Sequence, residues 1–172
     1  MVQNEFSRTF ALDRLAAEGE SFAIEANASE RQALATRLEL PALHELRAHG
    51  RIEFRGGRKV IAVTGRFEAV LDQVCVVTLE PFTNRTADAF ERLFTTEPEE
   101  VAEELVLDAE GDMPEPLEGG LLDLGELAVE ELAVGLDPHP RAPGAAAEGT
   151  AGLEEKDEGP FAALGRLKSR VN

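Results

Sequence analysis

The sequence predicts an α+β protein: an antiparallel β meander, forming a sheet or a partly closed barrel, packed by one or two helices. Three observations carry this prediction. The 172 residues are enough for one modest core but hardly for two domains. The run RIEFRGGRKVIAV, residues 51–63, alternates apolar and polar residues about a glycine pair, which is typical of a β-hairpin. The run LLDLGELAVEELAVGLDP, residues 121–138, has apolar residues at helical spacing.

The first part of the chain reads as two short strands followed by a helix. We expect strands over residues 6–11 and 21–26, the second because it alternates apolar and polar side chains. Ser29 and Gln32 have the spacing of a capping box. In this motif the serine side chain accepts the backbone N–H of the glutamine, and the glutamine side chain accepts the backbone N–H of the serine. The sequence therefore predicts a helix from this point to about Leu38.

Gly56 and Gly57 predict the geometry of the hairpin. Both can adopt the positive φ angles that a two-residue turn requires. Such a turn sets Arg55 opposite Arg58 and Ile52 opposite Ile61. This register directs four apolar side chains to the core face: Ile52, Phe54, Ile61 and Val63.

Downstream of the hairpin the meander is expected to continue. Residues 66–72 alternate as a strand with one wet face, and residues 74–79 read as a fully buried run that ends at a proline. From Asn84 a further strand is predicted, with Phe90 and Phe94 as anchors. The segment TADAFERLF could equally be a short helix, but a strand extends the meander.

The second helix has clear start and stop signals. Asp123 can cap its N-terminus, with Glu126 at the reciprocal position, while Gly135 suits the exit and Pro138 prevents continuation. An amphipathic helix of this length needs a docking partner to be stable, so we expect its apolar stripe to cover the sheet. The stripe consists of Leu124, Leu127, Ala128 and Leu132.

We expect a single domain over residues 1–136, in which residues 97–120 form a mobile acidic loop. Residues 137–172 are expected to be a flexible linker and a short terminal amphipathic helix. The linker prediction rests on a Pro-, Gly-, Ala- and Glu-rich composition, and the helix on the spacing of Phe161, Leu164 and Leu167.

The charge is distributed unevenly. The formal net charge is −17, and residues 93–140 contain 15 acidic and no basic side chains. This excess excludes a general attraction to nucleic acid or anionic lipid. The acidic segment is either a solvated linker or a binding element for a basic protein. In the second case the candidate protein-binding residues are Glu99, Glu100, Glu103 and Glu104.

One local region has the opposite sign. Residues 47–66 contain six basic side chains and one acidic side chain, Glu53. A twisted ribbon with this charge could lie along phosphates, or it could be a solvated hairpin that discourages edge pairing. A third reading is that the acidic segment folds onto it. The candidate RNA-binding residues are Arg51, Arg55, Arg58 and Lys59.

Catalytic and metal-binding patterns are weak. The three histidines lack metal-ligand spacing, and the single cysteine, Cys75, has no second thiol near it. No phosphate loop or nucleophile elbow is recognisable. We therefore expect no catalytic residues, metal or cofactor, and a protein that is not an enzyme. Without a membrane-length apolar run or an apolar signal region, we expect a cytoplasmic protein.

Three short motifs occur in order along the chain. The first contains Cys75, Pro81 and Phe82, the second Asp123, Leu124, Leu132, Pro138 and Pro140, and the third Pro160, Phe161, Leu164, Leu167 and Lys168. In this order they resemble the YceD family of large ribosomal RNA subunit accumulation proteins. The family has a Cys-x-x-Cys-x-x-Pro-Phe element, a helix that begins Asp-Leu and leaves through prolines, and a terminal Pro-Phe-x-x-Leu-x-x-Leu-Lys.

The resemblance implies a non-enzymatic factor needed for normal levels of large-subunit ribosomal RNA. Its partner would be a large-subunit ribosomal protein or ribosomal RNA; the alternative is a general interaction adaptor unrelated to ribosomes. Thr78 stands where the family has a second cysteine, so a metal-binding role does not carry over. Cys75 is then expected to be a small buried side chain in a strand.

Overall fold

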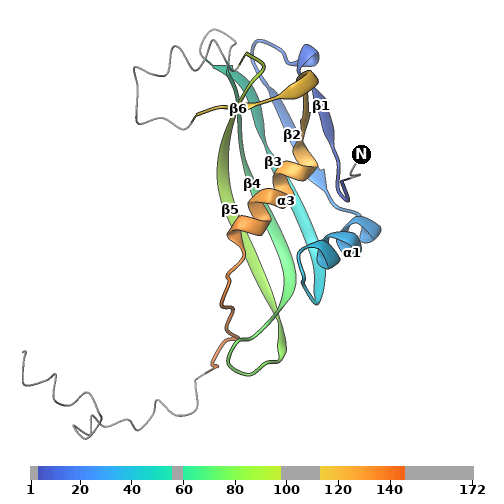
Figure 1. The fold of residues 1–172 in the computed structure, drawn as a ribbon, viewed down its shortest axis with the longest axis vertical. Coiled ribbons are helices and arrows are strands. Elements are labelled where there is room, and N and C mark those ends of the chain that lie inside the picture. Colours follow the sequence, from blue (N-terminus) through green and yellow to red (C-terminus); the bar gives the residue numbers. More distant parts are fainter. Residues whose placement is uncertain (1–3, 56–59, 98–112, 146–172) are drawn as a thin grey trace, which may run out of the picture.

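The computed structural model describes residues 4–55, 60–97 and 113–145, which build an α+β fold around an open five-stranded sheet (Figure 1). The sheet has the strand order β2-β3-β4-β5-β6 and is not closed into a barrel. The elements in chain order are β1 (Thr9–Ala11), the 3-10 helix η1 (Leu12–Arg14), β2 (Glu20–Glu25), α1 (Ala28–Arg37), β3 (Ala42–Arg55), β4 (Val60–Val74), β5 (Pro81–Thr95), β6 (Glu115–Pro116), the 3-10 helix η3 (Glu118–Gly120), β7 (Leu121–Asp123) and α3 (Leu124–Gly135).

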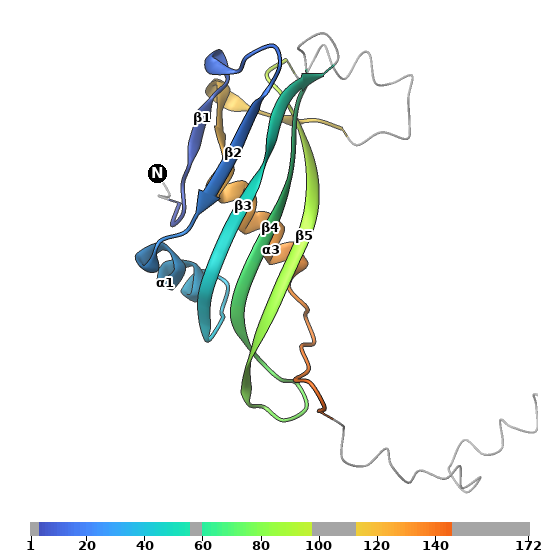
Figure 2. The ribbon, with the colours of Figure 1, turned by 180° about the vertical axis from the view of Figure 1, so that it is seen from behind.

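The antiparallel meander is confirmed. Strands β2 to β5 pair with their sequence neighbours in antiparallel fashion, and only the two-residue β6 runs parallel to its partner, β5. Strands β1 and β7 form a separate two-stranded sheet. The helix α3 crosses one face of the large sheet, while the opposite face is not covered by any element of the described ranges (Figures 1 and 2).

The register of the β3–β4 hairpin differs from the prediction by two residues. Ile52 pairs with Val63 and Arg55 with Val60, so four residues, 56–59, lie between the paired strands instead of two. A shift of two leaves every side chain on its expected face, because the pleat of a strand repeats every two residues. Burial of the core face therefore cannot distinguish the two registers.

The core lies between the sheet and α3. Large side chains from β3 and β4 meet the apolar stripe of α3, whose four predicted residues are all buried. Their burial removes apolar surface from water, which is the dominant favourable term in folding. The most deeply buried large side chains include Phe6, Leu34, Leu46, Ile52, Ile61, Val63, Phe67, Leu71, Val129 and Leu132.

Two expectations about the β4–β5 hairpin have opposite outcomes. The segment TADAFERLF lies within β5, which confirms the strand. The predicted buried run over residues 74–79 is wrong, since β4 ends at Val74 and Leu79 is 77% exposed. The chain reverses here: the Cys75 N–H donates to the Glu80 carbonyl at 2.9 Å and the Leu79 N–H to the Cys75 carbonyl at 2.8 Å. The apolar residues of this run form a turn instead of a strand.

The first helix begins two residues earlier than predicted. Asn27 is its N-cap, and the Asn27 side chain accepts hydrogen bonds from the N–H groups of Ser29 and Glu30, each at 3.0 Å. Glu30 completes the capping box by accepting from the Asn27 N–H at 2.7 Å. The Ser29 hydroxyl itself donates to the Asn27 side chain. The predicted Ser29–Gln32 box is therefore wrong, because asparagine is an equally strong cap and has a glutamate three residues on.

Helix α3 begins as predicted. The Asp123 carboxylate accepts from the N–H groups of Gly125 at 3.0 Å and Glu126 at 3.3 Å. Glu126 does not close the expected reciprocal bond to the cap, because its carboxylate pairs with Arg37 from the end of α1. The Glu126 side chain thereby joins the two helices.

Asp123 also fastens the N-terminal segment to α3. The Asp123 carboxylate accepts from the Ser7 hydroxyl at 2.7 Å, the Arg8 N–H at 2.8 Å and the Asn4 amide at 3.2 Å. The Leu124 N–H donates to the Arg8 carbonyl at 3.0 Å. One carboxylate thus joins segments more than one hundred residues apart in the sequence.

The predicted boundaries fall only partly within the described residues. Of the acidic loop expected over 97–120, residues 113–120 contain β6 and η3, while 98–112 lie outside the described ranges. In the expected linker, the Val76 N–H donates to the Pro140 carbonyl at 2.9 Å. The expected terminal helix lies outside the described residues. None of the helices in the described ranges is long and apolar enough to cross a membrane.

Candidate functional site

The described part of the predicted basic ribbon lies on the side of the sheet that α3 does not cover; Figure 2 views the sheet from that side. Arg51 and Arg55 lie on β3, on the face opposite to Ile52, and both are exposed. The other two candidate RNA-binding residues, Arg58 and Lys59, lie outside the described residues. The structure therefore places half of the predicted set.

Both described arginines are engaged by acceptors of the same chain. Arg51 donates to the Glu18 carbonyl, and its Nε lies 3.7 Å from the Glu53 carboxylate. Arg55 lies 3.4 Å from the same carboxylate and forms an ion pair with Glu91 across the sheet. The hydrogen bond that Arg55 donates to Glu91 raises the pKa of the guanidinium above its usual range. Carboxylates thus compensate part of the positive charge that the sequence pattern suggested.

Further cations lie on the same face. Arg47 pairs with Glu68 at 2.6 Å, and the register sets His49 directly opposite Arg66. Within the described ranges, Arg66 and Arg85 form no ion pair with an acidic side chain. Strand alternation alone gives Arg66 to the wet face, whereas the exposure of Arg85 depends on how β5 pairs with β4.

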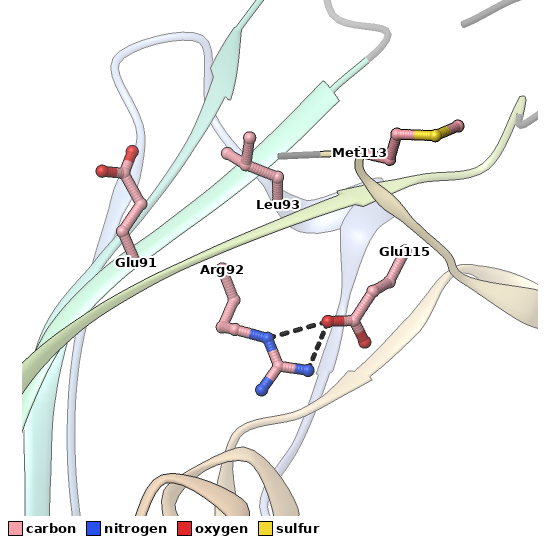
Figure 3. Close-up of a pocket in the computed structure, with 5 residues that line it drawn as sticks. All are labelled: Glu91, Arg92, Leu93, Met113 and Glu115. Carbon is pink, nitrogen blue, oxygen red and sulfur yellow. Dashed lines mark hydrogen bonds and ion pairs between the residues drawn. The ribbon is translucent and has the colours of Figure 1, made fainter. Parts of the chain in front are cut away.

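Glu99, Glu100, Glu103 and Glu104 lie outside the described residues. The acids that the structure does describe near this segment gather around Arg92 on β5. The Arg92 guanidinium donates to Glu115 through Nε at 2.8 Å, to Glu131 at 2.9 Å and to Glu130 at 3.5 Å (Figure 3 shows the Glu115 contacts). Three carboxylates therefore share one guanidinium.

This arrangement leaves the cluster with excess negative charge. Partial burial raises the pKa of Glu130, and the neighbouring carboxylates of Glu126, Glu115 and Glu131 raise it further, while Arg92 opposes the shift. Burial is the largest cause of this shift and the neighbouring carboxylates add to it, so the excess of negative charge follows from the three carboxylates around one guanidinium. Beside it lies a pocket of about 440 Å³, lined by Glu91, Arg92, Leu93, Met113 and Glu115 (Figure 3).

The turn after β4 contains Cys75, which belongs to the first of the three motifs that resemble the family. Cys75 is fully buried, as expected, but it lies in the turn after β4 and not in a strand. Its sulfur accepts the Thr78 N–H at 3.4 Å. Hydrogen bonds from the Thr78 side chain, and from the backbone at Ala142 and Thr78, lower the pKa of the thiol to about 7 against the effect of burial. The thiol thus holds the turn to the segment that follows α3.

Among the described residues, one histidine, His44, lies beside a carboxylate. His44 Nε2 lies 3.0 Å from Asp72, and the Thr83 hydroxyl donates to the same carboxylate at 2.8 Å. The hydrogen bond from Thr83 is the larger cause, and the one from His44 the smaller cause, that lowers the pKa of Asp72. His44 on β3, Asp72 on β4 and Thr83 on β5 are thus joined across three strands on the solvent-facing side of the sheet. Among the described residues, no group of three or more His, Cys, Asp and Glu side chains could hold a metal ion.

Sequence reasoning did not find the cluster around Arg92. Arg92 lies between Phe90 and Phe94, so strand alternation sets its side chain on the same, covered face as these two apolar residues, where a charge is unusual. A charged residue at an apolar position of a strand is the sequence signal for such a cluster, because a partly buried charge needs charged or polar partners. Which acids supply them depends on how β6 and α3 meet β5, which the sequence pattern does not reveal.

The comparison with protein families gives one match. A family model described as large ribosomal RNA subunit accumulation protein YceD matches residues 63–168, which is more than half of the chain. The matched range includes most of β4, all of β5, the Cys75 turn and α3. No curated protein and no solved structure matched the chain.

Proposed function

Because this chain belongs to the YceD family of large ribosomal RNA subunit accumulation proteins, we propose that it acts by binding a basic large-subunit ribosomal protein. The family description connects the chain with the large ribosomal subunit. In our proposal the protein catalyses no reaction and supports ribosomal RNA accumulation in the cytoplasm by holding its partner during assembly.

The observation that carries the proposal is the distribution of charge. Residues 93–140 contain 15 acidic and no basic side chains, in a chain of net charge −17. Electrostatic complementarity of this kind accelerates association with a cationic partner and selects against anionic ones. The shared Arg92 supports the same proposal, because the three carboxylates around it exceed the charge that one guanidinium supplies.

Binding of ribosomal RNA is the competing mode. The contacts of Arg51 and Arg55 with Glu53, Glu91 and the Glu18 carbonyl weigh against it, because a phosphate would have to displace them. RNA would also have to approach a protein of net charge −17.

Two variants, each with four substitutions, test the proposal. One changes the four candidate acids, Glu99, Glu100, Glu103 and Glu104, to Gln; the other changes the four candidate bases, Arg51, Arg55, Arg58 and Lys59, to Ser. Tagged proteins are purified from cells at low salt, and bound proteins and RNA are identified. We expect the four-acid variant to lose basic large-subunit ribosomal proteins and to lower the level of large-subunit ribosomal RNA, with the four-base variant close to wild type.

The opposite pattern, in which RNA is bound and is lost only in the four-base variant, would overturn the proposal. Stable partners that include no ribosomal component would identify an adaptor unrelated to ribosomes. Each of these outcomes is distinguishable in the same purification.

A further inference from the structure

Strand β5 is an edge strand over most of its length. On its inner side β5 pairs with β4 along its whole length. The paired positions run from Val74 opposite Pro81 to Val60 opposite Thr95. On its other side, β6 pairs with it at only two positions, Phe94 and Thr95. In the described part of the chain, no strand pairs with this outer edge between Pro81 and Leu93 (Figure 1).

The hydrogen bonds show which backbone groups point outward from that edge. The Thr95 carbonyl accepts the Leu117 N–H at 2.7 Å, so the odd-numbered residues of β5 direct their N–H and C=O groups away from β4. The N–H groups of Arg85 and Ala89 fit this pattern, because the side chains of the preceding residues, Asn84 and Asp88, accept from them at 2.8 Å.

These two local bonds are a form of edge protection. A side chain that accepts its neighbour's N–H occupies a donor that another strand would need. The same alternation directs the N–H groups of Ala87 and Glu91 outward. Ala87 lies between the two protected positions and Glu91 lies two residues after the second, and both residues are exposed. The edge is thus partly guarded and partly open.

The side chains around this edge give it a charge preference. Strand β5 and the elements next to it, β4, β6 and α3, contain eight carboxylates, namely Glu68, Asp72, Asp88, Glu91, Glu115, Glu126, Glu130 and Glu131. The arginines of the same four elements are Arg66, Arg85 and Arg92. The pocket of about 440 Å³ that Leu93 and Met113 help to line lies at the end of the open edge, where β6 begins (Figure 3).

We propose that the open edge of β5, from Arg85 to Leu93, docks an extended basic segment of a partner protein as an added strand. Outward N–H and C=O groups would supply the main-chain hydrogen bonds, and alternate side chains would meet the carboxylates. The pocket would receive an apolar side chain against Leu93 and Met113. This inference rests on the proposed binding of a basic protein and names the surface that binds it.

A second copy of the chain is the less favoured occupant. Each copy has a net charge of −17, so two copies repel each other, whereas a lysine-rich segment is attracted.

The test uses the full chain and a synthetic peptide of about twelve residues that alternates lysine and valine, with a glutamate–valine peptide as the charge control. Ala87→Pro removes an outward N–H at an edge position, where proline is tolerated. Ala87→Val is the matched control, because it keeps the N–H and favours a strand. We expect the proline variant to bind the lysine peptide about tenfold more weakly, with the valine variant unchanged and the glutamate peptide unbound. Amide exchange should slow at Ala87 and Glu91 in the complex.

Equal binding by the two variants would overturn the proposal, as would protection of these amides by self-association or by RNA. If Ala87→Pro keeps the capture of basic ribosomal proteins from cells, this docking edge is wrong and the proposed function stands. If the wild-type protein captures none of them, the proposed function itself fails.

Discussion

At the scale of single residues, Asp123 shows how much one side chain can organise. Its carboxylate caps α3 and accepts hydrogen bonds from Ser7, Arg8 and Asn4 of the N-terminal segment. The sequence pattern predicted the cap from the spacing within α3. It could not predict the other contacts, because they join residues 115 or more positions apart.

The charge of Asp123 predicts a specific dependence on pH. Burial opposes its ionisation, but hydrogen bonds from Ser7, the Arg8 N–H and the Glu126 N–H outweigh burial and lower its pKa. A lowered pKa stabilises the fold above the unfolded value of about 3.9, and this contribution disappears as the pH falls through the folded value. We expect Asp123→Asn to lower the free energy of unfolding at pH 7 by about 1 kcal/mol.

Urea unfolding between pH 7 and pH 2 checks this prediction. The loss of stability below about pH 4 should be shallower in Asp123→Asn than in the wild type. Asp13→Asn, an exposed change on η1, serves as the control and should follow the wild-type curve. Parallel curves for the wild type and Asp123→Asn would contradict the assigned role.

Cys75 is the second residue with a defined prediction. Thr78 stands where the motif resemblance leads us to expect a second cysteine, and its N–H donates to the buried thiol at 3.4 Å. We expect the purified protein to contain no stoichiometric zinc by elemental analysis. The thiolate absorbance of the native protein should rise with a midpoint near pH 7. Because this pKa lies below the unfolded value of about 8.5, the thiolate stabilises the fold at high pH, and this contribution is lost as the pH falls through about 7 and the sulfur is protonated.

Cys75→Ala should remove that pH-dependent contribution and leave partner binding intact. One tightly held metal ion per chain, or loss of binding in this variant, would show that the turn has a function beyond structure.

At the scale of elements, local signals were informative where a short motif fixes the geometry. The cap and apolar stripe of α3 were both predicted from residues within the helix, and both are observed. The hairpin register was wrong by two residues because the core face does not change under that shift. The start of α1 was missed because two adjacent capping patterns competed, although Asn27 and Glu30 were readable.

Gly125 tests the contact between α3 and the N-terminal segment. Alanine inside a helix is ordinarily more stable than glycine by about 1 kcal/mol. Here a Cβ would lie only 2.3 Å from the Phe6 carbonyl oxygen, a backbone atom that cannot move away alone. We expect Gly125→Ala to destabilise the protein by about 2 kcal/mol or more.

Thermal unfolding of Gly125→Ala should be compared with that of Val134→Ala. Val134 lies on the same helix with 86% of its surface exposed, so its replacement changes helix propensity alone and should raise stability slightly. An equal gain in both variants would show that Phe6 does not pack against Gly125 as the structure places it.

At the scale of the whole molecule, charge and the layered fold act together. The sheet presents one uncovered face on which Arg55 is compensated by Glu53 and Glu91, and one edge whose neighbours are mainly acidic. The sequence predicted the fold class and the two charge regions, because alternation and composition are local properties. It did not predict the pairing of the bases or the acids around Arg92, because those contacts depend on which strands become neighbours.

The most direct test of the account is the affinity of the intact protein for basic large-subunit ribosomal proteins and for large-subunit ribosomal RNA fragments near physiological salt. We predict that the wild type binds a ribosomal protein with steep salt dependence, and that changing Glu99, Glu100, Glu103 and Glu104 to Gln abolishes this binding. Binding of the RNA that is lost when Arg51, Arg55, Arg58 and Lys59 become Ser, and that is indifferent to the four-acid change, would contradict it.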